Sequence, residues 1–409
     1  MREYGGPLSR FTVVQAMVLT GLVILGILAF AGAFGEAEQP LELERLEGRD
    51  RITTAIAVSE AGWDSADTVV LATAVDFPDA LAASAVAAAT DAPLLLTDAL
   101  ALPRPVADEI ERLGAETVYL LGGEGVIDPT VPWQLDYLDL GLEVERIAGP
   151  DRYATAAAAA RRAGAPGGEA SIALGTDFPD AVAASALAAT PQRAPILLTE
   201  PDGLPEPTVG ALDDLGIERV EVVGGAASDA VVAELEALGL EVTPRVGADR
   251  YATSVSVAEE ALVRLEEPTP LVLASGEGFP DALAAGALSA RVGGTLVLTP
   301  SEGDSEPVEA LLREHAERWD VGFVVGGGGA ITLNGLERLA AMAADLPAPP
   351  VPEDPENGPE DDAGSPLGPD PDAPAEDEDD AEDDAEDDAE EEDSEGGNDT
   401  AAEATDGDS

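Results

Sequence analysis

The sequence has no cysteine, no lysine and a single histidine, His315, among its 409 residues. The absence of cysteine excludes disulfides, thiolate metal sites and cysteine nucleophiles, and it leaves export into an oxidising compartment open. The histidine lies in a charged stretch, Glu309–Arg318, where we expect it to face solvent. A Ser-His-Asp triad cannot be built several times from one histidine. These absences give no support to catalysis.

Positive charge is also scarce, because 20 arginines stand against 83 acidic residues and the net charge is −63. The segment 351–409 holds 28 acidic residues and no arginine, so the acidity belongs to both the tail and the body of the chain. Such a surface stays soluble at high ionic strength, where charges are screened within roughly 3 Å at about 1 M salt. We therefore expect a salt-rich or alkaline habitat. Repulsion from phosphate excludes nucleic acid as a partner.

Residues 11–35 carry no charge and follow a short flank, residues 1–10, that contains two arginines. The apolar run is long enough to span a bilayer, which takes about 20 residues. The arginines before it and the glutamates after it place the rest of the chain outside the cell. Small residues near its end also fit a cleaved signal peptide. We expect a transmembrane anchor or a signal peptide, and export of the chain in either case.

A nine-residue motif recurs three times, and its Phe-Pro-Asp triplet begins at residues 77, 178 and 279, a spacing of 101 residues each time. A fixed period of this kind indicates tandem structural units. Each unit has an Asp-Arg pair before the triplet and a glycine pair after a later apolar run. The pairs are Asp50-Arg51, Asp151-Arg152 and Asp249-Arg250, with Gly122-Gly123, Gly224-Gly225 and Gly326-Gly327.

Within each unit, short runs of Val, Leu and Ile alternate with helical patterns, including an Ala-rich helix expected over residues 78–90. This alternation predicts an α/β fold with a parallel sheet of about four strands in each unit. Three such units favour a pseudo-threefold arrangement. After the units, proline and acid dominate, which predicts a disordered tail that binds cations at most diffusely. The expected segments are 1–10, 11–35, repeats at 41–142, 143–241 and 242–345, and the tail 346–409.

The repeated motifs resemble the type 2 cell-wall-binding repeat family. The likeness is carried by Arg146–Thr155 (RIAGPDRYAT), by Arg245–Thr253 (RVGADRYAT), and by the Phe-Pro-Asp, Pro-Leu-Leu-Leu-Thr and strand-Gly-Gly motifs. It covers roughly residues 43–345. The resemblance implies three Rossmann-like modules packed as a pseudo-trimer, in an exported protein that attaches non-covalently to an anionic cell-wall polymer. In a chain this acidic, such binding requires local arginine clusters or bound cations.

Each repeated motif has a structural and a ligand-binding interpretation. Proline at the first helical position and an aspartate near the positive helix end suit a helix start. The repeated arginine forms an ion pair, such as Arg51 with Asp79, or grips a carboxylate or phosphate of a polymer. The glycines allow tight turns or line a binding loop, and both loops should meet at the carboxyl ends of the strands. The ligand-binding candidates are Arg51, Arg152, Arg250, Asp79, Asp180, Asp281, Gly122, Gly123, Gly224, Gly225, Gly326 and Gly327.

These observations favour an exported, non-catalytic module that binds a cell-envelope polymer, with no cofactor, no metal and no catalytic residue expected. One alternative is a structural spacer or surface-layer protein that recognises no polymer. A weaker alternative is an enzyme that modifies envelope glycans, for which one repeat would need a polar cluster that the others lack.

Overall fold

The computed structural model describes residues 41–76 and 78–347. The predicted membrane segment or signal peptide at 11–35 and nearly all of the predicted acidic tail lie outside these residues. Within the described ranges, no helix has the length and apolar character needed to cross a membrane.

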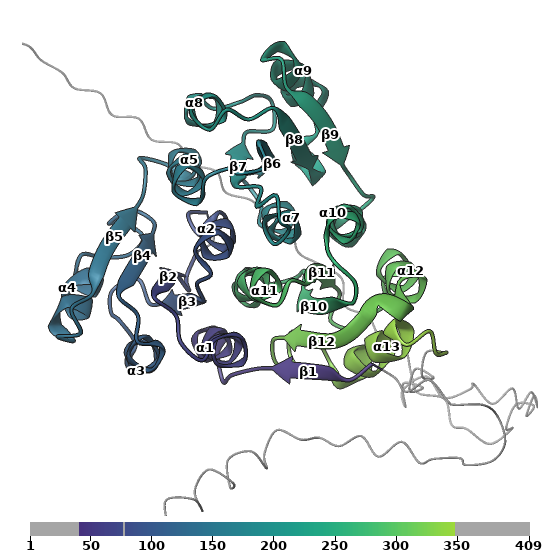
Figure 1. The fold of residues 1–409 in the computed structure, drawn as a ribbon, viewed down its shortest axis with the longest axis horizontal. Coiled ribbons are helices and arrows are strands. Elements are labelled where there is room, and N and C mark those ends of the chain that lie inside the picture. Colours follow the sequence, from purple (N-terminus) through teal and green to yellow (C-terminus); the bar gives the residue numbers. More distant parts are fainter. Residues whose placement is uncertain (1–40, 77, 348–409) are drawn as a thin grey trace, which may run out of the picture. The chain divides into compact units, whose positions relative to one another are not determined.

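The three repeats follow one plan of alternating strands and helices (Figure 1). The first contains β1 (Leu43–Leu46), α1 (Arg51–Gly62), β2 (Thr68–Thr73), α2 (Ala83–Thr90), β3 (Leu94–Thr97), α3 (Arg104–Leu113), β4 (Thr117–Leu121) and α4 (Thr130–Tyr137). The second contains β5 (Glu143–Ile147), α5 (Arg152–Ala163), β6 (Glu169–Leu174), α6 (Pro179–Ala183), α7 (Ser185–Ala188), β7 (Ile196–Thr199), α8 (Glu206–Asp214), β8 (Arg219–Val223) and α9 (Asp229–Ala237). The third contains β9 (Glu241–Arg245), α10 (Arg250–Arg264), β10 (Thr269–Ser275), α11 (Phe279–Val292), β11 (Thr295–Thr299), α12 (Glu306–Glu314), β12 (Trp319–Val325) and α13 (Leu333–Ala343).

These strands form three four-stranded parallel sheets, which confirms the predicted α/β repeats. The orders are β3-β2-β4-β5, β7-β6-β8-β9 and β1-β12-β10-β11. Each sheet therefore combines three strands of one repeat with the leading strand of another. The first strand of the described chain completes the last sheet, where Leu43 pairs with Gly322 and Leu46 with Val325. This pairing ties the first repeat to the third.

The Ala-rich helices α2, α7 and α11 pack against one another between the three sheets (Figure 1). Most of their residues are buried, as expected for helices with little side-chain bulk. One cluster of buried apolar residues accordingly contains members of all three repeats, from Leu46 to Val325. In the first repeat, however, the helix begins at Ala83 rather than at Pro78 as predicted, because the chain first makes a turn in which Ala83 N–H donates to the Ala80 carbonyl.

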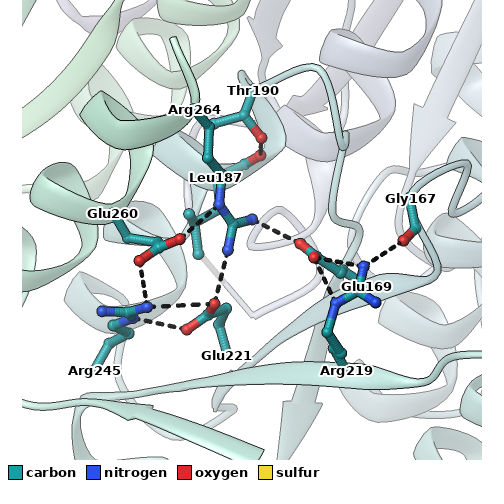
Figure 2. A network of polar contacts seen from close by, with 9 residues as sticks. All are labelled: Gly167, Glu169, Leu187, Thr190, Arg219, Glu221, Arg245, Glu260 and Arg264. Carbon is teal, nitrogen blue, oxygen red and sulfur yellow. Dashed lines mark hydrogen bonds and ion pairs between the residues drawn. The ribbon is translucent and has the colours of Figure 1, made fainter. Parts of the chain in front are cut away.

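The second and third repeats are also joined by a network of three arginines and three glutamates (Figure 2). Arg264 of α10 donates to Glu169 of β6 at 2.6 Å and to Glu221 of β8 at 2.8 Å. Its Nε also donates to Glu260 on its own helix at 2.8 Å. Only 11% of the Arg264 side chain is exposed. Charges that are largely removed from water are costly without their partners. Because these partners come from two repeats, the network favours one packing of the second repeat against the third.

The first and second repeats meet differently at the matching position. Tyr119, the third residue of β4, occupies the place that Glu221 has in β8. The guanidinium of Arg162, on α5, lies 4.3 Å from the centre of the Tyr119 ring. A cation–π contact thus stands where the other interface has a buried ion pair.

Candidate functional site between neighbouring repeats

The Phe-Pro-Asp and Gly-Gly loops of one repeat meet at the carboxyl ends of its strands. The first loop follows β2, β6 or β10, and the second follows β4, β8 or β12. In the second repeat, the Gly225 N–H donates to the Asp180 carboxylate at 2.9 Å. In the first, the Gly123 N–H donates to Asp79 at 3.4 Å. The repeated aspartate and glycine pair therefore form one small site in each of these repeats.

Glycine is required at the first position of the pair because the carboxylate lies against it. Gly224 has a φ of +58°, and a Cβ added there would lie 2.1 Å from an Asp180 oxygen. A Cβ at Gly326, in the third repeat, would lie 2.8 Å from an Asp281 oxygen. The pair thus combines a left-handed turn with a close approach of the aspartate.

The Asp of each Asp-Arg pair caps a helix. Asp50, Asp151 and Asp249 accept hydrogen bonds from backbone N–H groups in the first turns of α1, α5 and α10. These bonds, chiefly that from Thr53, hold the pKa of Asp50 below its usual range. The aspartate of each Asp-Arg pair therefore serves as the N-cap of a helix.

The arginine of each pair is anchored to its own repeat, and Arg51 and Arg250 also approach another repeat. Arg51, Arg152 and Arg250 each donate through Nη1 to a carbonyl just beyond β2, β6 or β10, at 2.6–2.7 Å. The Arg250 guanidinium also lies 5.7 Å from the centre of the Phe178 ring in the second repeat. Arg51 lies 6.0 Å from the Phe279 ring in the third repeat. The corresponding phenylalanine of the first repeat, residue 77, lies outside the described residues.

The ion pair that we considered between Arg51 and Asp79 is not among the salt bridges of the described chain. Across the interface, the charge of Arg51 acts on Asp281, which belongs to the third repeat. Burial raises the pKa of Asp281, and the nearby Arg51 charge opposes that rise. The physical reason is that the arginine extends from the start of one repeat across the interface to the Phe-Pro-Asp loop of its neighbour.

Asp180 has the same environment at the interface of the second and third repeats. Burial raises its pKa, while the Gly225 N–H and the charge of Arg250 act in the opposite direction. A carboxylate held in this way is a partly desolvated charge facing an arginine, which is a suitable place to orient a polar ligand group.

A cavity of about 330 Å³ lies at this interface. It brings the candidates Asp180, Gly224, Gly225 and Arg250 together. The full lining is Asp177, Pro179, Asp180, Gly224, Gly225, Val246, Gly247, Asp249, Arg250 and Thr253. At the other two interfaces the glycine turn also adjoins the segment that leads to the next arginine, since the Gly122 N–H donates to Ile147 and the Gly326 N–H to Leu46.

Sequence reasoning missed a second set of arginines. Arg45 donates to the Gly326 carbonyl at 2.7 Å, and Arg146 donates to the Gly122 carbonyl at 2.6 Å. Each braces the glycine turn of the sheet that its strand joins. Their regular place a few residues before each Asp-Arg pair was a signal for them. Arg245 has the same place, but it binds Glu221 and Glu260 instead.

The single histidine has no part in this site. His315 is half-buried rather than exposed as predicted, because its ring packs edge-on against Trp319 at 6.1 Å. It does not line the cavity. Across residues 41–76 and 78–347, no cluster of three or more histidine, cysteine, aspartate or glutamate side chains is arranged to hold a metal ion.

Comparison with known proteins connects this geometry to a family. The family model described as cell wall binding domain 2 (CWB2) matches the chain three times, at residues 45–132, 146–231 and 246–334. The N-acetylmuramoyl-L-alanine amidase LytC of Bacillus subtilis (strain 168) is 28% identical over 271 residues, which cover 66% of this chain and 53% of that protein. The amidase enhancer of the same organism is 24% identical over 274 residues, covering 67% of this chain and 37% of that protein.

Two solved structures from Clostridium difficile have a similar fold. Cwp6 superposes with a TM-score of 0.69 at 23% identity, covering 78% of this chain and 51% of that one. Cwp8 gives a TM-score of 0.65 at 27% identity, covering 75% and 52%. The chain spans about half the length of these proteins, or less in the case of the amidase enhancer.

Proposed function

Because the chain belongs to the cell wall binding domain 2 family, we propose that it is an exported, non-catalytic protein whose three repeats bind a cell-envelope polymer and attach it to the cell surface. The observation that carries this proposal is the placement of Arg51 and Arg250. Each extends from one repeat to the Phe-Pro-Asp loop of a neighbouring repeat, and Arg250 does so at a cavity that also contains the glycine turn.

The arginine is suited to an anionic group of a polymer. In the described chain, Arg250 has one hydrogen bond, from Nη1 to the Gly276 carbonyl. Its remaining N–H groups are free for a carboxylate or phosphate, which a guanidinium can hold with two parallel hydrogen bonds. The anchoring bond and the Phe178 ring fix the orientation of the guanidinium before the ligand arrives, which lowers the entropic cost of binding. A local arginine of this kind attracts an anionic group of the polymer even though the surface of the chain as a whole is strongly acidic.

Repetition strengthens the case for a polymer rather than a small ligand. A chain with one arginine site at each of three interfaces can engage several units of a repeating polymer at once. Linked sites raise overall affinity because each further contact is intramolecular. Single clefts of modest affinity therefore suffice for stable attachment.

The interface between the third and first repeats differs from the others. Arg49 is exposed there, at a position that holds Pro150 or Ala248 in the other repeats. Gly278 replaces the aspartate that precedes phenylalanine elsewhere, although Glu47 lies beside the glycine turn. We propose that Arg49 adds to anion binding at this interface, beside Arg51.

The alternatives fit these contacts less well. A spacer that recognises no polymer would be expected to hold the repeated arginines in buried ion pairs, whereas Arg51 is exposed and forms none with the other described residues. An enzyme acting on glycans would need a polar cluster that one repeat holds and the others lack, whereas Asp180 and Asp249 of the cavity have counterparts in every repeat. We therefore infer that any catalytic activity of the amidase-related proteins belongs to parts that this chain does not match.

Co-sedimentation of the purified protein with isolated envelope material from the source organism tests the proposal. We expect saturable binding that the Arg152→Ala/Arg250→Ala variant loses while its circular dichroism and unfolding midpoint stay near the parent values. The matched control is Arg104→Ala/Arg161→Ala, which removes the same charge from exposed helical positions. Equal loss in both variants would mean that net charge alone matters, and an absence of binding by the parent would favour the spacer.

A further inference from the structure

An aromatic pair stands on the outer surface of the first repeat. Trp133 and Tyr137 are one helical turn apart on α4, with ring centres 5.8 Å apart and ring planes inclined by 24°. Trp133 is 63% exposed and Tyr137 is 80% exposed. The opposite side of the helix supplies the packing contacts, since Val131 and Leu135 are completely buried. The pair is therefore not needed to attach α4 to its sheet.

This exposure is unusual for the chain. Only 4% of its residues are aromatic, and the other two tryptophans, Trp63 and Trp319, are buried. Both of these donate their ring N–H to a backbone carbonyl. Single exposed apolar residues are common on protein surfaces, whereas two large rings placed side by side mark a binding surface.

The second repeat shows that the helix does not require the rings. Val231 and Leu235 of α9 are buried as Val131 and Leu135 are. Gln134 and Glu234 accept the same type of hydrogen bond, from the N–H of Leu102 and of Leu204. This correspondence places Ala233 and Ala237 where α4 has Trp133 and Tyr137. The aromatic pair is thus an addition to a helix that the fold builds equally well with alanine.

The charges around the pair select among ligands. Residues 113–145 contain no arginine, and the exposed neighbours Asp136 and Asp139 are acidic. This surface repels anionic polymers, anionic membranes and a second copy of the same acidic face. Helices that lie on membranes combine their aromatic residues with lysine or arginine, which α4 lacks.

We propose that Trp133 and Tyr137 form a stacking platform for uncharged sugar units of a polysaccharide. A pyranose presents an apolar face of C–H groups, which packs on the electron-rich face of an aromatic ring. Its hydroxyls are donors, and ionised carboxylates such as that of Asp136 are pure acceptors. Rigid aromatic side chains also lose little conformational entropy on binding. This platform is separate from the inter-repeat clefts and does not depend on their arginines.

Trp133 itself supplies the measurement, because it is the one exposed tryptophan of the three. The full chain is titrated with cellotetraose and with chitotetraose up to millimolar concentrations, while tryptophan emission and acrylamide quenching are recorded. We expect a saturable blue shift and protection from acrylamide with at least one of the two sugars. The Arg152→Ala/Arg250→Ala variant should respond as the parent does.

Variants then assign the response to the platform. Tyr137→Ala keeps the reporter and should weaken sugar binding several-fold. Trp133→Ala/Tyr137→Ala should abolish the binding seen by isothermal titration calorimetry, and it should fold, as α9 does with alanine at both places. Adding Ala233→Trp/Ala237→Tyr to the Trp133→Ala/Tyr137→Ala variant should restore sugar binding. The proposal is overturned if neither sugar gives a saturable change, or if the pair instead mediates a dimer that sediments as such and disappears in the double variant.

Discussion

The Ser84 and Ser185 hydroxyl oxygens lie 2.7 Å apart in a buried hydrogen bond between α2 and α7. These residues occupy the same place in the first and second repeats, and the third repeat has Gly286 there. A Cβ at Gly286 would lie 2.8 Å from Ser185 Oγ and 3.1 Å from Ser84 Cβ. Two serines and one glycine therefore fill the space where the three central helices meet, and no third side chain fits.

Gly286→Ala should destabilise the protein despite its position within a helix. Overpacking a core costs about 1–3 kcal/mol, and this exceeds the gain of up to about 1 kcal/mol of alanine over glycine in a helix. Urea unfolding measures the difference. The control is Gly329→Ala, whose added Cβ has open space. Stability at or above the parent value in Gly286→Ala would show that the space between the central helices holds a third side chain.

Arg264→Ala should weaken the joint between the second and third repeats. Removing one partner of a buried charge network costs about 3–5 kcal/mol. Here the change leaves Glu169 with Arg219 alone and Glu221 with Arg245 alone. The exposed pair of Arg104 and Asp108 is the comparison, and its loss through Arg104→Ala should cost about 0–1 kcal/mol. Thermal unfolding of both variants at low and high salt provides the measurement. Similar small effects in the two variants would contradict a structural role for the network.

Asp180→Asn should make stability less dependent on pH. The folded-state pKa of Asp180 is raised mainly by burial, so the ionised carboxylate opposes folding. This penalty is absent below the unfolded pKa of about 3.9 and complete above the raised folded pKa. The variant should therefore be more stable than the parent at neutral pH, and the difference should shrink as pH falls through the raised pKa. Asparagine keeps an acceptor for the Gly225 N–H.

Chemical denaturation of parent and variant across this pH range checks the sign. Asp98→Asn, at an exposed position, controls for the loss of one negative charge from a strongly acidic chain. If the difference in free energy of unfolding between Asp180→Asn and the parent does not vary with pH, the Asp180 carboxyl is not desolvated in the folded protein.

Polymer binding should be weaker at the lowest salt concentration than at moderate salt. The net repulsion between the acidic chain and an anionic polymer acts over the Debye length, about 30 Å at 0.01 M salt and about 10 Å at 0.1 M. The arginine contacts act over a few ångströms and survive moderate screening. Envelope binding measured from low to high salt should rise first and fall later. A steady decrease from the lowest salt would indicate that a long-range positive field steers binding instead.

The repeated units and their parallel sheets could be predicted because motif spacing and the alternation of apolar runs are local properties. The pairing of β1 with the third sheet could not be predicted, because a short strand such as Leu43–Leu46 could pair equally well with the strands of its own repeat. Its partner is set by packing almost 280 residues away. The start of α2 at Ala83 was missed for a similar reason, since proline and aspartate suit a helix start and a turn alike.

The candidate site was predicted as sets of loops, and the structure shows from which repeats they come. The meeting of Asp180 with Gly225 followed from strand topology. The contact of Arg51 with Phe279 could not be predicted in this way, because it depends on how the repeats pack. A motif within one repeat carries no information on the packing between repeats. The exposed ring pair on α4 was overlooked because Trp133 and Tyr137 fit an ordinary amphipathic helix until the burial of its other face is known.

Hydrogen–deuterium exchange with soluble fragments of the envelope polymer tests whether the polymer binds between the repeats, because it reports where the polymer lies. We expect slower exchange in peptides that contain Gly224-Gly225 and Val246–Thr253, and in the matching segments at the other two interfaces. Exchange in α3 and α8, away from the cavity lining, should not change. Saturating polymer that leaves the inter-repeat segments unaffected, while it protects other surfaces, would contradict binding at these clefts.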